Sequence, residues 1–133
     1  MGVRVWGVVE DRLIEVRVEP AESGAGLRVE GVPQDRARTT ADRIRAALIN
    51  SELVREVPAA VVTLEPNLRA GPMSELDVSI ALALLASIGR LGAHLRWVLA
   101  TGRLGLDGAV ETRDLAEPTS IVTIVTALGG TSG

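Results

Sequence analysis

The chain has 133 residues, a formal net charge of −3, and no cysteine, phenylalanine or tyrosine. All 14 of its basic residues are arginine. Without lysine the chain has no side-chain amine that could act as a base and no phosphate-binding loop of the ATPase type. Without cysteine it forms no disulfide. The net negative charge gives no overall positive field that would hold nucleic acid.

The length and hydropathy predict one soluble, cytoplasmic domain over residues 1–128, followed by a flexible tail at 129–133. The longest apolar run, 76–88, is interrupted by Asp77 and is shorter than the roughly 20 residues of a membrane-spanning helix. Strand-like alternation starts by Val3, where a signal peptide would have its apolar stretch.

Alternating apolar and polar residues predict strands in the first part of the chain. Segments 3–9 and 13–19 flank the short link 10–12 and predict a hairpin. A turn-rich loop at 20–26 leads to a third short strand over 27–31.

The period then changes to that of a helix. Apolar residues share one face of segment 39–53, which predicts an amphipathic helix. Thr39, with Asp42 three residues later, is a variant of the capping box and predicts that the helix begins there.

The second half predicts a further strand over 60–64 and a helix over 75–87 that is apolar on almost every side and therefore buried. Segment 97–106 is typical of a strand, and the Asp-Gly pair at 107–108 predicts a hairpin turn after it. The β-branched residues of 119–128 favour a strand, while the position of this segment after a hairpin suits a helix. Together these elements predict an α+β fold with a mainly antiparallel sheet and two helices on one face.

Three segments carry motifs in a fixed order. Segment 31–53 has a Gly-x-Pro-x-Asp start and an Arg-x-Arg-Ala-Ala helix that ends in Asn-Ser, and 61–87 has a Ser-x-x-Asp helix start followed by Ile-Ala-Leu. Segment 101–110 contains Gly-Arg-Leu-x-Leu-x-Gly. The motifs resemble those of the N-terminal domain of magnesium-chelatase-like proteins, of the ChlI and ComM type. In that family an acidic residue is usual at the position of Arg103.

This resemblance implies the Lon protease-like fold, which is shared with a ribosomal-protein domain (domain 2-like). The family carries its ATPase module after this domain. The sequence contains no phosphate-binding loop, so we expect no ATP hydrolysis and no cofactor.

Ser74 falls on the position of the catalytic serine in Lon-type proteases, and Glu117 falls near the position of their lysine. A carboxylate accepts a serine proton far less readily than a lysine amine of lowered pKa. His94, the only histidine, has no carboxylate placed to orient it. Ser74 with Asp77 three residues later instead predicts a helix cap, and a Lon-type serine peptidase that uses Ser74 is the alternative.

An arginine cluster marks the beginning of the first predicted helix and consists of Arg36, Arg38, Arg43 and Arg45. We interpret it as a solvated face paired with Asp35 and Asp42. A weak nucleic-acid-binding or anion-binding surface is the alternative. The carboxylates Asp35, Asp42 and Asp77 lack the spacing of a metal site, and no metal is expected.

The sequence therefore predicts a free-standing, non-catalytic domain that acts in assembly or regulation. By family analogy, its partner would be a separate AAA+ ATPase in DNA processing. Two hypotheses remain for segment 119–128: it covers an edge of the domain itself, or it leaves that edge open for a homo-oligomer or another chain.

Overall fold

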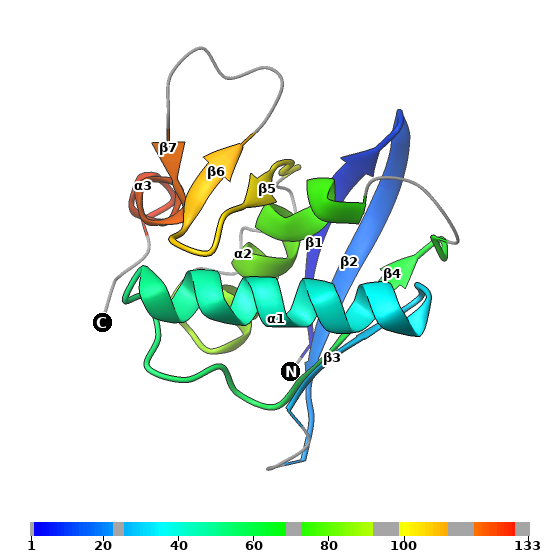
Figure 1. The fold of residues 1–133 in the computed structure, drawn as a ribbon, viewed down its shortest axis with the longest axis horizontal. Helices are drawn as coiled ribbons and strands as arrows, with labels where there is room; N and C mark the ends of the chain where they lie inside the picture. The colour runs from blue at the N-terminus through cyan, green and yellow to red at the C-terminus, as the bar shows by residue number, and fades with distance from the viewer. Residues whose placement is uncertain (1, 23–25, 69–72, 92–98, 112–118, 130–133) are drawn as a thin grey trace.

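The computed structural model describes residues 2–22, 26–68, 73–91, 99–111 and 119–129 (Figure 1). Four strands form a mixed sheet in the order β1-β2-β4-β3, and three short strands form an antiparallel sheet in the order β5-β6-β7. The strands are β1 (Val3–Val9), β2 (Arg12–Pro20), β3 (Leu27–Glu30), β4 (Ala60–Glu65), β5 (Arg103–Leu104), β6 (Ala109–Glu111) and β7 (Thr119–Ser120). The helices are α1 (Gln34–Asn50), the 3-10 helix η1 (Met73–Leu76), α2 (Asp77–Ser87) and α3 (Ile121–Ala127). This mixture of helices and sheets confirms the α+β class.

The first hairpin is formed as predicted. β1 and β2 pair antiparallel, and Val9 lies opposite Arg12. The two residues between them, Glu10 and Asp11, have φ angles of 48° and 64°, which is the left-handed backbone that a tight hairpin turn requires.

The predicted antiparallel pairing holds for β1–β2 and β2–β4, but β3 and β4 are parallel. Helix α1 joins these two strands, and a helical crossover returns the chain in the same direction. In the order of the strands, β3 lies at one edge of the sheet.

The core lies between one face of the four-stranded sheet and the helices α1 and α2 (Figure 1). Inward residues of β1 and β2, among them Val5, Ile14 and Val16, are fully buried. Every residue of α2 from Asp77 to Leu85 is buried, which confirms the burial predicted from its apolar circumference.

A close contact between β1 and the beginning of α2 requires glycine at position 7. A Cβ there would lie 2.6 Å from Leu76 Cδ2 and 2.7 Å from Ser79 Oγ. The Ser79 hydroxyl donates a hydrogen bond of 2.6 Å to the carbonyl of Ala100, so a buried polar group is satisfied where strand and helix meet.

The prediction that the first helix begins at Thr39 is wrong, because α1 begins at Gln34, directly after Pro33. The Pro33 carbonyl accepts a hydrogen bond of 3.0 Å from the Ala37 N–H. Pro33 is the N-cap residue, with φ −56° and ψ 143°, and its ring fixes φ so that the chain is extended directly before the first helical turn. Thr39 thus lies within the helix, and its hydroxyl donates to the carbonyl of Asp35 at 3.1 Å.

The end of the chain forms β7 and then helix α3, which decides between the two predictions for 119–128. The Ser120 hydroxyl caps the helix by accepting a hydrogen bond from the Thr123 N–H. Ile121 and Val125 are buried, at 0% and 1% exposure, so their apolar side chains are covered by this chain itself.

The predicted strand over 97–106 is shorter than expected: β5 contains only Arg103 and Leu104, and residues 97–98 lie outside the described ranges. The hairpin turn at 107–108 is confirmed, since the Gly105 N–H donates to the Ala109 carbonyl at 2.9 Å. Across the described ranges, no helix has both the length and the hydropathy for crossing a bilayer.

Candidate functional site

An ion pair between α1 and α2 is the most buried charged contact among the described residues. Arg43 on α1 donates from Nε to Asp77 Oδ2 at 2.7 Å and from Nη2 to Oδ1 at 2.8 Å. The Asp77 side chain is 0% exposed and that of Arg43 is 15% exposed. Asp77 is the first residue of α2, where the helix dipole favours a carboxylate. The planar guanidinium binds both oxygens at once, which fixes the two helices relative to each other.

A third hydrogen bond closes the site from the β5–β6 hairpin. The backbone N–H of Leu104 donates to Asp77 Oδ2 at 2.9 Å. The carboxylate therefore receives three hydrogen bonds, from a helix and from a strand of the second sheet. Its neighbour Val78 is fixed in the same region, because its N–H donates to the Gly102 carbonyl at 3.1 Å. Asp77 joins α1, α2 and β5 at one point.

Two opposing effects act on the titration of this pair. Burial raises the pKa of the Asp77 carboxyl, and this outweighs the lowering by the hydrogen bonds from Arg43 and Leu104 and by the charge of Arg103. The hydrogen bond to Asp77 raises the pKa of Arg43. The two directions disagree on whether the charged pair is favoured. The bond lengths of 2.7 and 2.8 Å are those of a charged guanidinium and a carboxylate, and we describe the pair as ionised at neutral pH.

The C-terminal end of α1 is also fastened to the β5–β6 hairpin. Asn50 donates from its side-chain amide to the carbonyl of Leu106 at 2.8 Å. Gly108 has a φ of +92°, and a Cβ there would approach Ser51 Cβ to 3.0 Å. The hairpin is therefore held at two places, by Asp77 at the beginning of α2 and by Asn50 at the end of α1.

Ser74 lies in the 3-10 helix η1, which precedes α2. The N-cap residue of α2 is Leu76, without a side-chain cap, and the Asp77 carboxylate binds Arg43 instead of the η1 backbone. The predicted capping pair of Ser74 and Asp77 is therefore not formed. The first position of α2 does favour a carboxylate. Because Asp77 is buried and faces the Arg43 guanidinium, its carboxylate contacts Arg43 and does not cap the helix.

A small hollow of about 250 Å³ adjoins Ser74. Its lining consists of Asp35, Arg36, Thr39, Thr40, Arg43, Met73 and Ser74. Among the described residues, this lining contains no imidazole and no side-chain amine, the groups that usually take a serine proton. Its carboxylate, Asp35, is exposed in the first turn of α1. His94 and Glu117, the two other groups considered from the sequence, lie outside the described residues.

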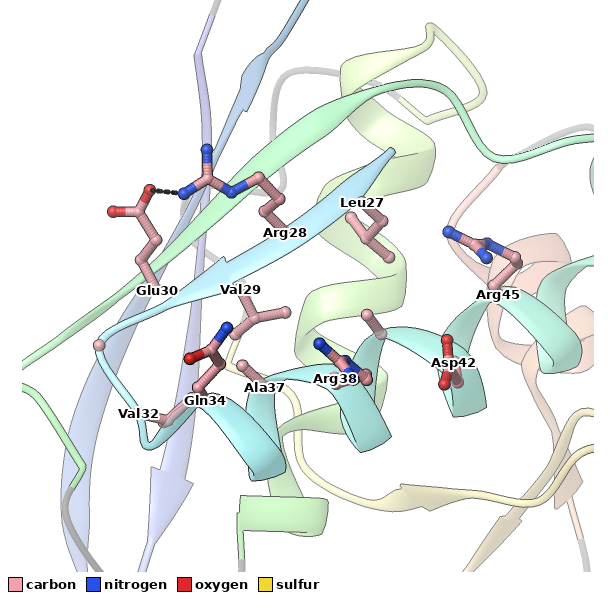
Figure 2. A pocket seen from close by; sticks show the side chains of 12 residues that line it. Leu27, Arg28, Val29, Glu30, Val32, Gln34, Ala37, Arg38, Asp42 and Arg45 are labelled. Atoms are coloured by element: carbon pink, nitrogen blue, oxygen red, sulfur yellow. Dashed lines mark ion pairs between the residues drawn. The ribbon is translucent and has the colours of Figure 1, made fainter. Parts of the chain in front are cut away.

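The structure separates the predicted arginine cluster into three environments. Arg43 is bound to Asp77, and Arg36 lines the hollow at Ser74. Arg38 and Arg45 line a larger groove of about 490 Å³ between β3 and α1 (Figure 2). The expected ion pairs with Asp42 are not made by Arg38 or Arg45, and neither makes one elsewhere within the described ranges.

Comparison with known families identifies the family of this chain. Residues 14–127 match the model of the family described as subunit ChlI of Mg-chelatase, which is well over half of the 133 residues. The chain belongs to the ChlI family. No curated protein matches its sequence.

The three motifs that resemble the ChlI family meet at the Asp77 carboxylate. Arg43 comes from the segment 31–53, Asp77 from 61–87 and the Leu104 N–H from 101–110. The sequence pointed to Arg43 and Asp77 separately: Arg43 as part of a solvated arginine face, with anion binding as the alternative, and Asp77 as part of a helix cap. The available signal was that an arginine and an aspartate both fall on the motifs of one ChlI domain, and that Asp77 begins a helix that is otherwise apolar.

The carboxylates considered for a metal do not converge. Asp77 is enclosed by Arg43 and Leu104, whereas Asp35 and Asp42 are exposed on α1. Among the residues that the structure describes, no three side chains of histidine, cysteine, aspartate or glutamate gather in a way that could hold a metal ion.

Proposed function

We propose that this ChlI domain has no catalysis of its own and acts in assembly or regulation beside an AAA+ ATPase, in DNA processing. Its chemistry-bearing residues are used to hold its own elements together. The observation that carries the proposal is the Arg43–Asp77–Leu104 contact: it joins all three family motifs and encloses the Asp77 carboxylate at their meeting point.

The enclosed carboxylate supports a structural role for this centre. Asp77 is fully buried and its two oxygens accept three hydrogen bonds. A general base must reach the proton it removes, and Asp77 is enclosed by its own partners. Arg43 is likewise held by both of its bonds to Asp77.

The surroundings of Ser74 support the same proposal. Its hydroxyl makes no hydrogen bond to any described residue. Among the described residues that line the hollow beside it, Asp35 has the only carboxylate, and it is exposed. An activated serine needs a positioned base of suitable pKa. The alternative function, a Lon-type serine peptidase, depends on such a base.

A fluorophosphonate probe distinguishes the two functions. We expect no labelling of the wild type above the level of the Ser74→Ala variant, with Ser87→Ala as a matched control on the same part of the chain. Labelling that disappears in Ser74→Ala and persists in Ser87→Ala would establish the peptidase. Hydrolysis of casein or a p-nitrophenyl ester that follows the same pattern would do so independently.

The regulatory part of the proposal is tested on an ATPase. The purified domain is added to an AAA+ ATPase of the ChlI family from the same source, and the rate of ATP hydrolysis is measured with and without DNA. We expect a saturable change in rate as the domain is titrated. A rate that stays constant, together with no complex in size-exclusion chromatography, contradicts the regulatory role.

A further inference from the structure

The outer edge of β3 is open in the described structure. β3 pairs with β4 on one side and is the last strand of its sheet. On its other side lies the groove of about 490 Å³, which α1 borders (Figure 2). An open strand edge presents unpaired N–H and C=O groups to whatever lies beside it.

The register of the sheet identifies the backbone groups at this edge. The Gly26 carbonyl accepts a hydrogen bond from Ala60 on β4, so Gly26 faces β4. Successive residues of a strand direct their backbone groups to opposite edges. Leu27 and Val29 therefore direct their N–H and C=O groups into the groove, spaced to pair with an added strand.

The groove has an apolar floor and a polar wall. Leu27, Val29, Ala37 and Ala41 form the floor, and each is 6–8% exposed. On the wall, three charged side chains project from α1 on the groove side, as Figure 2 shows. They are Arg38, Asp42 and Arg45.

The charges of this groove favour an acidic occupant. Arg28 and Glu30, on β3, pair with each other at 3.8 Å and cancel. Arg38 and Arg45 make no ion pair within the described ranges, and Asp42 offsets one of their two charges. The Arg45 side chain extends toward the beginning of β3. Its Nη2 lies 3.9 Å from the position that a Cβ would occupy if Gly26 had one.

We propose that this groove binds an extended acidic peptide of a partner protein, which adds to β3 as a further strand. The peptide backbone pairs with Leu27 and Val29. A glutamate that faces inward lays its methylene groups on the alanine floor and brings its carboxylate to Arg38 or Arg45. This inference rests on the assembly role proposed above and names its docking site.

Two other occupants fit the groove less well. A second copy paired edge to edge would place the arginines of both α1 helices against each other, and like charges oppose association. Nucleic acid would bring its phosphates close to the Asp42 carboxylate, and the described residues that line the groove include no aromatic side chain for base stacking.

Binding is tested with a short fluorescent peptide in which glutamate alternates with threonine, by fluorescence anisotropy at low salt. The matched peptide has lysine in place of glutamate. We expect saturable binding of the acidic peptide and none of the basic one. Equal binding of both, or of neither, overturns the proposal.

Amide methylation tests strand pairing without changing the protein. One peptide is N-methylated on its glutamates and a second on its threonines, because alternate N–H groups face the same edge of a strand. We expect one methylated peptide to lose binding and the other to keep it. Binding that survives both changes, or is lost in both, contradicts strand addition.

Charge reversal tests the location. Arg45→Glu is expected to weaken the acidic peptide about tenfold, since a favourable charge contact is replaced by a repulsive one. The matched control Arg12→Glu changes an exposed arginine at the far hairpin and is expected to leave the affinity unchanged. Circular dichroism confirms that both variants fold. Equal weakening in both variants shows a general charge effect and overturns the groove as the site.

The remaining outcomes also decide the question. A dimer in sedimentation that Arg45→Glu abolishes, or duplex DNA that competes with the peptide, assigns the groove to another occupant and overturns the proposal. If the domain changes the ATPase rate while binding no acidic peptide, the groove proposal falls and the regulatory role stands.

Discussion

Two regions of this protein use the same pair of chemical groups in opposite surroundings. On the outer face of the four-stranded sheet, Glu15 lies between Arg4 at 3.3 Å and Arg17 at 2.9 Å. Both arginine side chains there are about half exposed, at 54% and 42%, and the Glu15 side chain is 17% exposed. Between the helices, Arg43 and Asp77 are 15% and 0% exposed.

The difference lies in what happens when one partner is removed. On the sheet, water replaces the lost partner, so an exposed pair contributes little to stability. Between the helices, the remaining charge stays buried without compensation. Bond lengths alone do not show this distinction, because 2.9 Å on the sheet and 2.7 Å in the interior are nearly the same. The buried pair therefore determines how the elements are arranged.

The largest expected effect comes from Arg43→Met, which keeps an unbranched apolar stem and removes the guanidinium with its charge. It leaves the Asp77 carboxylate buried with only the Leu104 N–H as donor. We expect a loss of about 3–5 kcal/mol in the free energy of unfolding at pH 7, measured by urea denaturation. The matched control is Arg45→Met, an exposed position on the same helix, which should change stability by less than about 0.5 kcal/mol. Equal losses in the two variants would contradict the distinction between the regions.

The pH dependence of the Arg43→Met variant sharpens this result. Burial raises the folded-state pKa of Asp77 above its unfolded value, so protonation favours the folded state. This contribution is fully present below the unfolded pKa and is lost as the pH rises through the folded pKa. Without Arg43 the folded pKa rises further, and the deficit relative to wild type should shrink on acidification by up to about 1.4 kcal/mol per pH unit in that window. A deficit that stays constant between pH 8 and pH 4 would show that lost packing is the cause.

The sheet hairpin and the burial of α2 were predictable from the sequence because both depend on local periodicity. Residues of β1 and β2 alternate between faces, and the apolar residues of α2 surround the helix. The beginning of α1 was misplaced because Thr39 and Asp42 imitate a capping box, whereas Pro33 sets the actual start. In α3, the cap at Ser120 and the burial of Ile121 and Val125 override the β-branched composition.

The site was predictable only in its parts. Arg43 and Asp77 were both singled out, but these two residues are 34 positions apart. No local sequence pattern indicates that a residue within one helix contacts the first residue of another. The contact of Leu104 with Asp77 could not be predicted, since its donor is a backbone N–H and nearly every residue has one. Side-chain patterns report periodicity, whereas pairing between distant elements depends on the packed fold.

A smaller effect is expected on the exposed face of the sheet. Glu15→Gln removes the charge that both Arg4 and Arg17 contact, and we expect a loss of at most about 1 kcal/mol at low salt. Because screening weakens exposed pairs, the loss should fall further when the ionic strength is raised to about 1 M. Urea denaturation at both salt concentrations measures it. A loss as large as that of Arg43→Met, or one that salt does not reduce, would remove the contrast.

The smallest net effect is expected when both buried charges are removed together. Arg43→Met combined with Asp77→Leu leaves neither an unpaired charge nor a buried carboxylate, and the Leu104 N–H alone loses its acceptor. Replacing a buried ion pair by apolar residues is often neutral or stabilising, and one unsatisfied N–H costs about 1–3 kcal/mol. These opposing contributions should leave the double variant more stable than either single variant. The part of the pH dependence that Asp77 causes should be absent from it. A double-mutant cycle measures the coupling. Strict additivity would show that Arg43 and Asp77 act independently, and the buried pair would then have no more influence on the arrangement of the helices than the exposed pairs on the sheet.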